Sequence, residues 1–188
     1  DLLLDGVSLK DWDIKHVRKA LAYVPQDVFL FSTTIAENIS FGQDGMSTEQ
    51  IMQAAKMADV YENIMEFPGQ FETILGERGV TLSGGQKQRV SIARALAKNP
   101  SMLILDDCLS AVDTHTEHKI LNNLKKIMVG KTSLIISHRV SSAKLANRIM
   151  VLQDGQIVET GNHAQLMKRK GYYYELYQNQ LNEEENGL

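Results

Sequence analysis

The chain has 188 residues, 43% hydrophobic and 23% charged, which is long enough to bury a core as one globular domain. Its formal net charge of −3 gives no reason to expect a nucleic acid as the partner. The single cysteine, Cys108, excludes a disulfide within the chain and fits a reducing compartment, and no apolar run approaches the roughly 20 residues of a membrane helix.

The first part of the chain predicts two strand pieces, a short helix and a third strand, at residues 2–4, 7–9, 13–20 and 22–24. Asp5-Gly6 marks a tight turn between the first two pieces, and the third strand ends at Pro25-Gln26. Because the chain starts abruptly on a strand, we expect Asp1 to be a cut and not a natural beginning.

Capping signals predict helices in the middle of the chain. Ser47 and Gln50 can open a helix that runs to Ala58, and a second helix is expected from Tyr61 to Phe67 before Pro68-Gly69. We expect these helices to build a helical subdomain.

The central stretch of the chain is Leu82-Ser83-Gly84-Gly85-Gln86. Ser83 can cap a helix that continues to Ala97, and Gln86 can bond back to the cap. The two glycines remove side chains from the first turn, where N–H groups and the positive end of the helix dipole point outward. That geometry suits an oxyanion such as a phosphate.

A second informative stretch is the apolar run 102–105, which ends in Asp106 and Asp107. It predicts a central parallel strand buried on both faces. The carboxylates leave its C-terminal end, where open α/β sheets bind their ligands.

The rest of the chain continues the alternation of helices and strands. A helix is expected over 114–128, with Thr114 and Glu117 as a capping box, and a strand over 132–137 delivers His138. Asp154-Gly155 predicts a hairpin turn. Two closing helices, at 162–168 and 172–180, precede an acidic tail.

In this order the stretches resemble the motifs of ATP-binding cassette (ABC) ATPases, in particular the nucleotide-binding domains of ABC exporters. Residues 82–86 resemble the signature loop and 103–106 the Walker B strand. Gln26 matches the Q-loop, 110–113 the D-loop and His138 the switch histidine. The resemblance implies an α/β fold of the P-loop NTPase type, with a mainly parallel sheet and a helical subdomain.

The same resemblance implies four segments along the chain. They are a partial catalytic core with the Q-loop at 1–45, a helical subdomain with the signature at 46–98, a catalytic core with Walker B, D-loop and switch histidine at 99–181, and a flexible tail at 182–188.

The resemblance also implies the cofactors ATP and Mg²⁺ and gives residues their roles. Asp106 and Gln26 would hold Mg²⁺, and Gln26 would also bond the attacking water. Asp107 would polarise that water, and His138 would steady the γ-phosphate. The residues expected to contact ATP across a dimer, or to link its two sites, are Leu82, Ser83, Gly84, Gly85, Gln86 and Asp113.

An ATPase of this type needs a phosphate cradle, G-x-x-x-x-G-K-[ST], which the sequence does not contain. Gly130-Lys131-Thr132 is not one, because Lys125 stands where the first glycine belongs and Gly130 reads as a helix C-cap. We therefore expect a domain that lacks its N-terminal portion and, alone, binds ATP weakly or not at all.

Asp107 departs from the glutamate of exporters that hydrolyse ATP well. Its carboxylate is one methylene shorter, and a misplacement of about an ångström can cost around 10²-fold in rate. Together with the intact signature, this resembles the degenerate-site subunit of heterodimeric exporters. A homodimer with slow turnover is the alternative.

The partners implied are a second nucleotide-binding domain, a heterodimer by preference, and membrane domains contacted by residues 29–39 and 75–79. The location implied is the cytoplasmic face of the cell membrane. Importer cassettes are the nearest alternative class. DNA-repair cassettes would insert a coiled coil between Gln26 and Leu82, where no sustained heptads occur, and translation-associated proteins would carry two cassettes.

Overall fold

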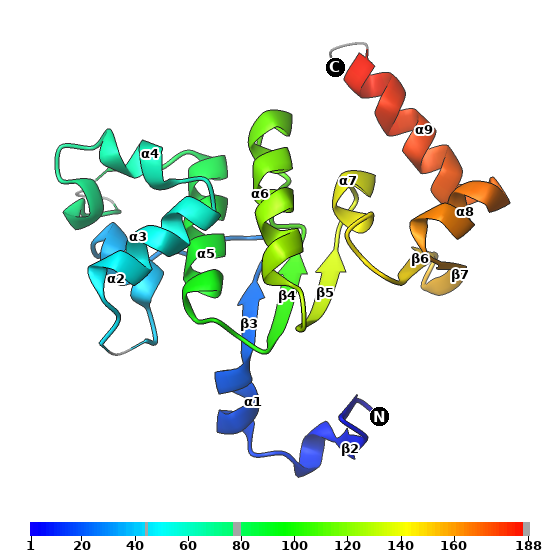
Figure 1. Cartoon of the computed structure of the whole chain (residues 1–188), viewed down its shortest axis with the longest axis horizontal. Helices are drawn as coiled ribbons and strands as arrows, with labels where there is room; N and C mark the ends of the chain where they lie inside the picture. The colour runs from blue at the N-terminus through cyan, green and yellow to red at the C-terminus, as the bar shows by residue number, and fades with distance from the viewer. Residues whose placement is uncertain (44, 77–79, 186–188) are drawn as a thin grey trace. The chain divides into compact units, whose positions relative to one another are not determined.

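The computed structural model describes residues 1–43, 45–76 and 80–185. They fall into two compact units, the first ending at Leu134 and the second beginning at Ile135. Figure 1 labels the helices and strands of both. Among the described residues, no helix combines the length and the apolar content needed to cross a membrane.

The first unit begins with an antiparallel hairpin. Strands β1 (Leu3–Leu4) and β2 (Val7–Ser8) pair across a turn in which Asp5 and Gly6 both have positive φ, which explains the glycine. A 3₁₀ turn, η1 (Leu9–Asp11), then leads into α1 (Ile14–Ala20), whose N-cap is Asp13.

The central sheet has the order β3-β4-β5, with bounds Leu21–Val24, Met102–Asp106 and Thr132–Ile136. β3 runs parallel to β4, and Val24 pairs with Leu105. The expectation that β4 is buried on both faces is wrong for the described residues. Leu103 and Leu105 are buried, whereas Ile104 between them is half-buried, so only one face of the strand is fully covered.

The helical part of this unit packs on α5 (Gly84–Ala97), which contacts both α2 and α3 (Figure 1). Ala54, Val90 and Ala93 are almost fully buried between these helices. The other elements of this part are α2 (Ile35–Ser40), α3 (Thr48–Met57), α4 (Tyr61–Met65) and η2 (Gln70–Glu72). The predicted capping box of Ser47 and Gln50 is confirmed at α3.

Helix α6 (Thr114–Ile127) starts differently from the prediction. Its N-cap is Asp113, whose carboxylate accepts a hydrogen bond from the Thr116 backbone N–H at 3.0 Å. The expected capping box of Thr114 and Glu117 is therefore wrong: Thr114 is the first helical residue, and Glu117 is buried on the inner side of the helix. The C-cap of α6 is Met128, so the interpretation of Gly130 as the C-cap is wrong by two residues; Gly130 has φ +74 in the turn that follows the helix.

The second unit has its own core, formed by Val140, Ile149, Leu166 and Tyr173. Its elements are α7 (Val140–Ala143), the hairpin β6 (Ile149–Gln153) and β7 (Gln156–Gly161), α8 (His163–Arg169) and α9 (Tyr172–Glu185). The Asp154-Gly155 turn is confirmed, with positive φ at both residues. Helix α9 continues to Glu185, into the segment predicted as a flexible tail.

Candidate functional site

The turn before α5 has the predicted capping box. Ser83 Oγ accepts from the Gln86 N–H at 3.2 Å, and Gln86 Oε1 accepts from the Ser83 N–H at 2.9 Å. Leu82 is buried and holds the turn to the core, while Ser83 and Gly84 are exposed. An exposed helix tip of this kind presents first-turn N–H groups to a ligand.

Gly85 has a steric reason to be a glycine in addition to the one expected from the sequence. A Cβ at this position would lie 2.7 Å from the carbonyl oxygen of Ala111, closer than two such atoms can approach. A Cβ on Gly84 would lie 3.5 Å from the Ala111 Cβ, which is ordinary contact. Gly85 therefore lets α5 pack closely on the loop that follows β4, and Gly84 leaves the exposed tip without a side chain.

The loop after β4 is also bonded to α5 through Gln88, a residue that sequence reasoning missed. Gln88 Nε2 donates to Ser110 Oγ at 2.9 Å, and Gln88 Oε1 accepts from the Ala111 N–H at 3.0 Å. The amide is buried, with 6% of the residue exposed. A glutamine at helical spacing from Gly85 gave no signal of this long-range contact.

Gln26, Asp106 and Asp107 leave the sheet at one edge, as predicted. Val24 pairs with Leu105 in parallel, so the chain positions after each lie level at the C-terminal ends of β3 and β4. Gln26 is exposed and the two aspartates are half-buried. Asp107 has φ +42, in the left-handed region that aspartate tolerates better than most residues.

Tyr23 is a second residue that the sequence did not single out. Its hydroxyl donates to Asp106 Oδ2 at 2.9 Å, and this hydrogen bond raises the pKa of Tyr23. The bond orients one of the two carboxylates at the sheet edge.

The donor set at this edge suits a hard cation. The amide oxygen of Gln26 and the carboxylate of Asp106 are oxygen ligands of the kind that Mg²⁺ prefers, and Mg²⁺ commonly binds one or two carboxylates together with substrate phosphates. Within the described ranges, no group of three or more His, Cys, Asp or Glu side chains could hold a metal by itself.

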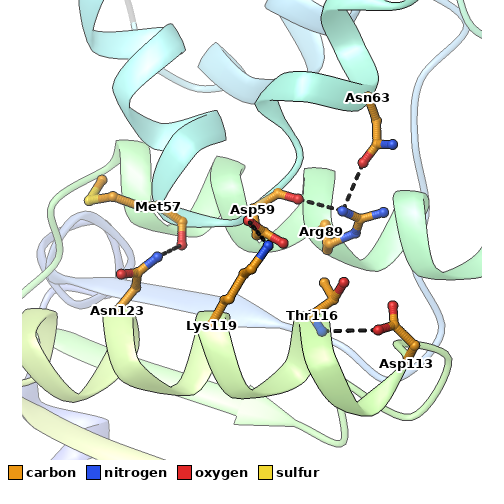
Figure 2. A network of polar contacts seen from close by, with 8 residues as sticks. All are labelled: Met57, Asp59, Asn63, Arg89, Asp113, Thr116, Lys119 and Asn123. Carbon is orange, nitrogen blue, oxygen red and sulfur yellow. Dashed lines mark hydrogen bonds and ion pairs between the residues drawn. The ribbon is translucent and has the colours of Figure 1, made fainter.

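A polar network joins α5 to the α3–α4 corner and to α6 (Figure 2). Arg89 donates to the backbone oxygen of Asp59 and to Asn63 Oδ1, the latter at 2.9 Å. Asn123 on α6 donates to the Met57 backbone oxygen at 3.0 Å. These contacts, with an ion pair of 3.9 Å between Lys119 and Asp59, tie the helical part to α6.

Asp113 lies at the start of α6, beside this network (Figure 2). The hydrogen bonds from Thr116 lower the pKa of its carboxyl, and the positive charge of Arg89 contributes in the same direction. The residue therefore carries its charge at neutral pH on an exposed helix tip.

His138 belongs to the second unit, where it follows β5 with an exposed side chain. Gln180 on α9 donates to the His138 backbone oxygen at 2.7 Å and accepts from the Val140 N–H at 2.8 Å. The turn that carries the histidine is thus fixed by α9. Glu77 and Arg78, expected to face membrane domains, lie outside the described residues.

Comparisons with known proteins place the chain in a family. The ABC transporter family model matches residues 1–110. The chain is 45% identical to ABC transporter B family member 4 of Dictyostelium discoideum, over 98% of the chain and 24% of that protein. It is 41% identical to the ATP-dependent lipid A-core flippase of Syntrophus aciditrophicus, over 99% of the chain and 31% of that protein.

Among solved structures, the chain matches a bacterial Atm1-family ABC exporter with ATP bound. The TM-score is 0.89 at 41% identity, over 95% of the chain and 32% of that structure. The chain spans about a quarter to a third of the length of these relatives. With a family model that matches more than half of its residues, this chain belongs to the ABC transporter family.

Proposed function

We propose that the chain is part of the ATP-binding domain of an ABC exporter, which couples ATP binding and hydrolysis to transport across a membrane. The observation that carries the proposal is the exposed tip of α5, at Ser83 and Gly84, packed against the loop that follows the paired carboxylates of β4. The relatives named as a flippase and an exporter support it.

The partner in this proposal is a second nucleotide-binding domain, arranged head to tail. Ser83, Gly84 and Gly85 would bind the γ-phosphate of ATP held by the partner, since N–H groups at a helix N-terminus favour an anion. Asp113 would lie at the interface and link the two sites. The contact needs the terminal phosphate, so hydrolysis would release it and shift the membrane domains between states.

In the chain's own site, Gln26 and Asp106 would hold Mg²⁺, which when bound neutralises charge on the phosphate oxygens. Asp107 would orient and polarise the attacking water, and His138 would bond the γ-phosphate. These residues act by position and charge, as phosphoryl transfer requires. The site would lie at the cytoplasmic face of the membrane.

The short carboxylate of Asp107 further suggests a heterodimer in which this chain's own site is slow. A carboxylate that lies about an ångström from its best position can cost around 10²-fold in rate. The main role of the chain would then be to complete the faster site of its partner with its Ser83–Gln86 turn.

The test is Ser83→Arg in the full-length protein. The bulky cation would block the phosphate contact, so ATP hydrolysis at the partner's site should be abolished. Ser47→Arg is a matched control, because Ser47 caps α3 through the same capping box but lies on another helix. Unchanged hydrolysis in Ser83→Arg, or equal loss in both variants, would contradict the proposal.

A further inference from the structure

The side chain of Gln88 is a buried amide with both ends bonded to one loop. It lies on α5, three residues after Gly85, so the two residues share a helix face. Its Nε2 donates to Ser110 Oγ at 2.9 Å and its Oε1 accepts from the Ala111 N–H at 3.0 Å. A buried amide with both ends bonded has a single orientation.

The hydrogen bonds continue from Ser110 to Asp107. Ser110 Oγ donates to the backbone oxygen of Asp107 at 3.1 Å. The amide nitrogen of Gln88 has no free lone pair, so the serine oxygen must accept from it. The single serine proton is then available for the backbone oxygen of Asp107. The two hydrogen bonds therefore run in one direction, from Gln88 to Ser110 and from Ser110 to Asp107.

Asp107 is a residue whose backbone needs such support. Its φ of +42 places it in the left-handed region, which residues other than glycine, asparagine and aspartate rarely adopt. The Ser110 backbone N–H also points at the Asp107 oxygen, at 3.4 Å. The bonded carbonyl therefore holds the turn that aims the Asp107 carboxylate.

The loop is held from a second side by the start of α5. Gly85 approaches the Ala111 carbonyl so closely that a Cβ would lie 2.7 Å from it. The turn of Ser83 and Gln86 directly precedes this contact on the same helix. The helix tip and the carboxylate turn are thus joined by Gln88 and Gly85 through one pair of loop residues, Ser110 and Ala111.

We propose that Gln88 is a positioning residue that joins the Ser83–Gln86 turn to the turn at Asp107, so that the two move as one body. This inference rests on the proposed function and deepens it. The group that polarises water in this chain's own site would then be set by the same helix whose tip contacts the partner's phosphate. Engagement of that tip would in this way reach the chain's own site.

Two readouts test the proposal in the full-length protein: hydrogen exchange of the 107–112 amides, and ATP turnover measured at this chain's own site. Gln88→Met keeps the volume but removes both hydrogen bonds, so exchange at Ala111 should rise by up to about tenfold. Turnover should fall about tenfold or more, while KM stays within about twofold, because positioning and not binding is lost.

Ser110→Ala separates the two connections that Gln88 makes, one directly to Ala111 and the other through Ser110 to Asp107. It leaves the bond from Gln88 to Ala111 in place, so Ala111 exchange should be unchanged while kcat falls as in Gln88→Met. Ser110→Thr restores the hydroxyl and should recover kcat relative to Ser110→Ala. Gln50→Met is the matched control, since it removes one capping bond from an exposed glutamine on α3 and should change neither readout.

The outcomes distinguish this inference from the proposed function. Unchanged Ala111 exchange in Gln88→Met would show that Gln88 does not hold the loop, and would overturn the inference whatever the activity. Equal effects of Gln88→Met on kcat and KM, or no recovery in Ser110→Thr, would overturn the positioning role. An unmodified full-length protein that hydrolyses no ATP would overturn the proposed function, which the exchange measurements do not depend on.

Discussion

The hydroxyl of Tyr23 on β3 donates a hydrogen bond of 2.9 Å to Oδ2 of Asp106 on the neighbouring strand β4. The two residues are 83 positions apart in the sequence and lie at the edge where the sheet presents its polar side chains. The bond fixes one oxygen of the carboxylate that we propose holds Mg²⁺. It also raises the pKa of Tyr23, with smaller contributions from burial and from the charge of Asp106.

This bond predicts a pH dependence of stability. A tyrosine whose pKa is raised in the folded state stabilises the fold below its ordinary pKa of 10.0, and the contribution is lost as the pH rises through the folded value. The free energy of unfolding should therefore fall above about pH 10, and it should fall less in Tyr23→Phe than in the wild type. Urea unfolding at a series of pH values across that range measures this free energy. With Tyr172→Phe as an exposed control, identical curves for Tyr23→Phe and wild type would contradict the bond.

The two glycines of the helix tip should respond oppositely to alanine. Gly85→Ala would force a Cβ against the Ala111 carbonyl, which is backbone and cannot swing away, so the fold should lose about 1–3 kcal/mol of stability. Gly84→Ala meets only ordinary contact and gains helix propensity, worth less than about 1 kcal/mol. Chemical denaturation of both variants compares them. Equal stabilities would show that α5 does not pack on the loop as described.

Arg89 should matter more than the ion pair beside it. Arg89→Leu leaves the Asp59 carbonyl and the Asn63 side chain without their donor, so we expect a loss of about 1–2 kcal/mol. Lys119→Leu breaks only an exposed 3.9 Å pair and should cost less than about 0.5 kcal/mol. Thermal unfolding ranks them; a larger loss in Lys119→Leu would reverse this assignment.

Local signals in the sequence predicted much of this structure. The caps at Ser47 and Ser83 follow from residues three apart, and the Asp154-Gly155 turn needs only its own two residues. At α6, the neighbours Asp113 and Thr114 could both cap, and the helix starts one residue earlier than the local pattern favoured. Such a choice depends on where packing sets the first turn.

Long-range contacts could not be predicted in the same way. Tyr23 bonds to Asp106, and Gln88 bonds to Ser110, only because the fold brings β3 beside β4 and α5 beside the loop that follows β4. The burial of β4 was overestimated for the same reason, since an apolar run does not say which of its faces a helix will cover. The spacing of residues in the sequence predicted the polar groups of the site, but not the residues that fix them in place through hydrogen bonds.

Asp107→Glu tests the slow-site proposal in the full-length protein. The longer side chain should bring the carboxylate to the attacking water and raise turnover at this chain's own site, by up to about 10²-fold. The left-handed backbone at this position favours aspartate, so a small loss of stability should accompany the gain. Single-turnover hydrolysis at each site separates the two; equal rates at both sites in the unmodified protein would contradict the proposal.

The most direct measurement is photolabelling of the full-length protein with an ATP analogue that carries its reactive group on the γ-phosphate. After illumination, mass spectrometry locates the modified residues of this chain. If the tip of α5 contacts the partner's terminal phosphate, the label will lie within Leu82–Gln86, and unlabelled ATP will compete it away. Label elsewhere in the assembly, with none on this turn, would contradict the account.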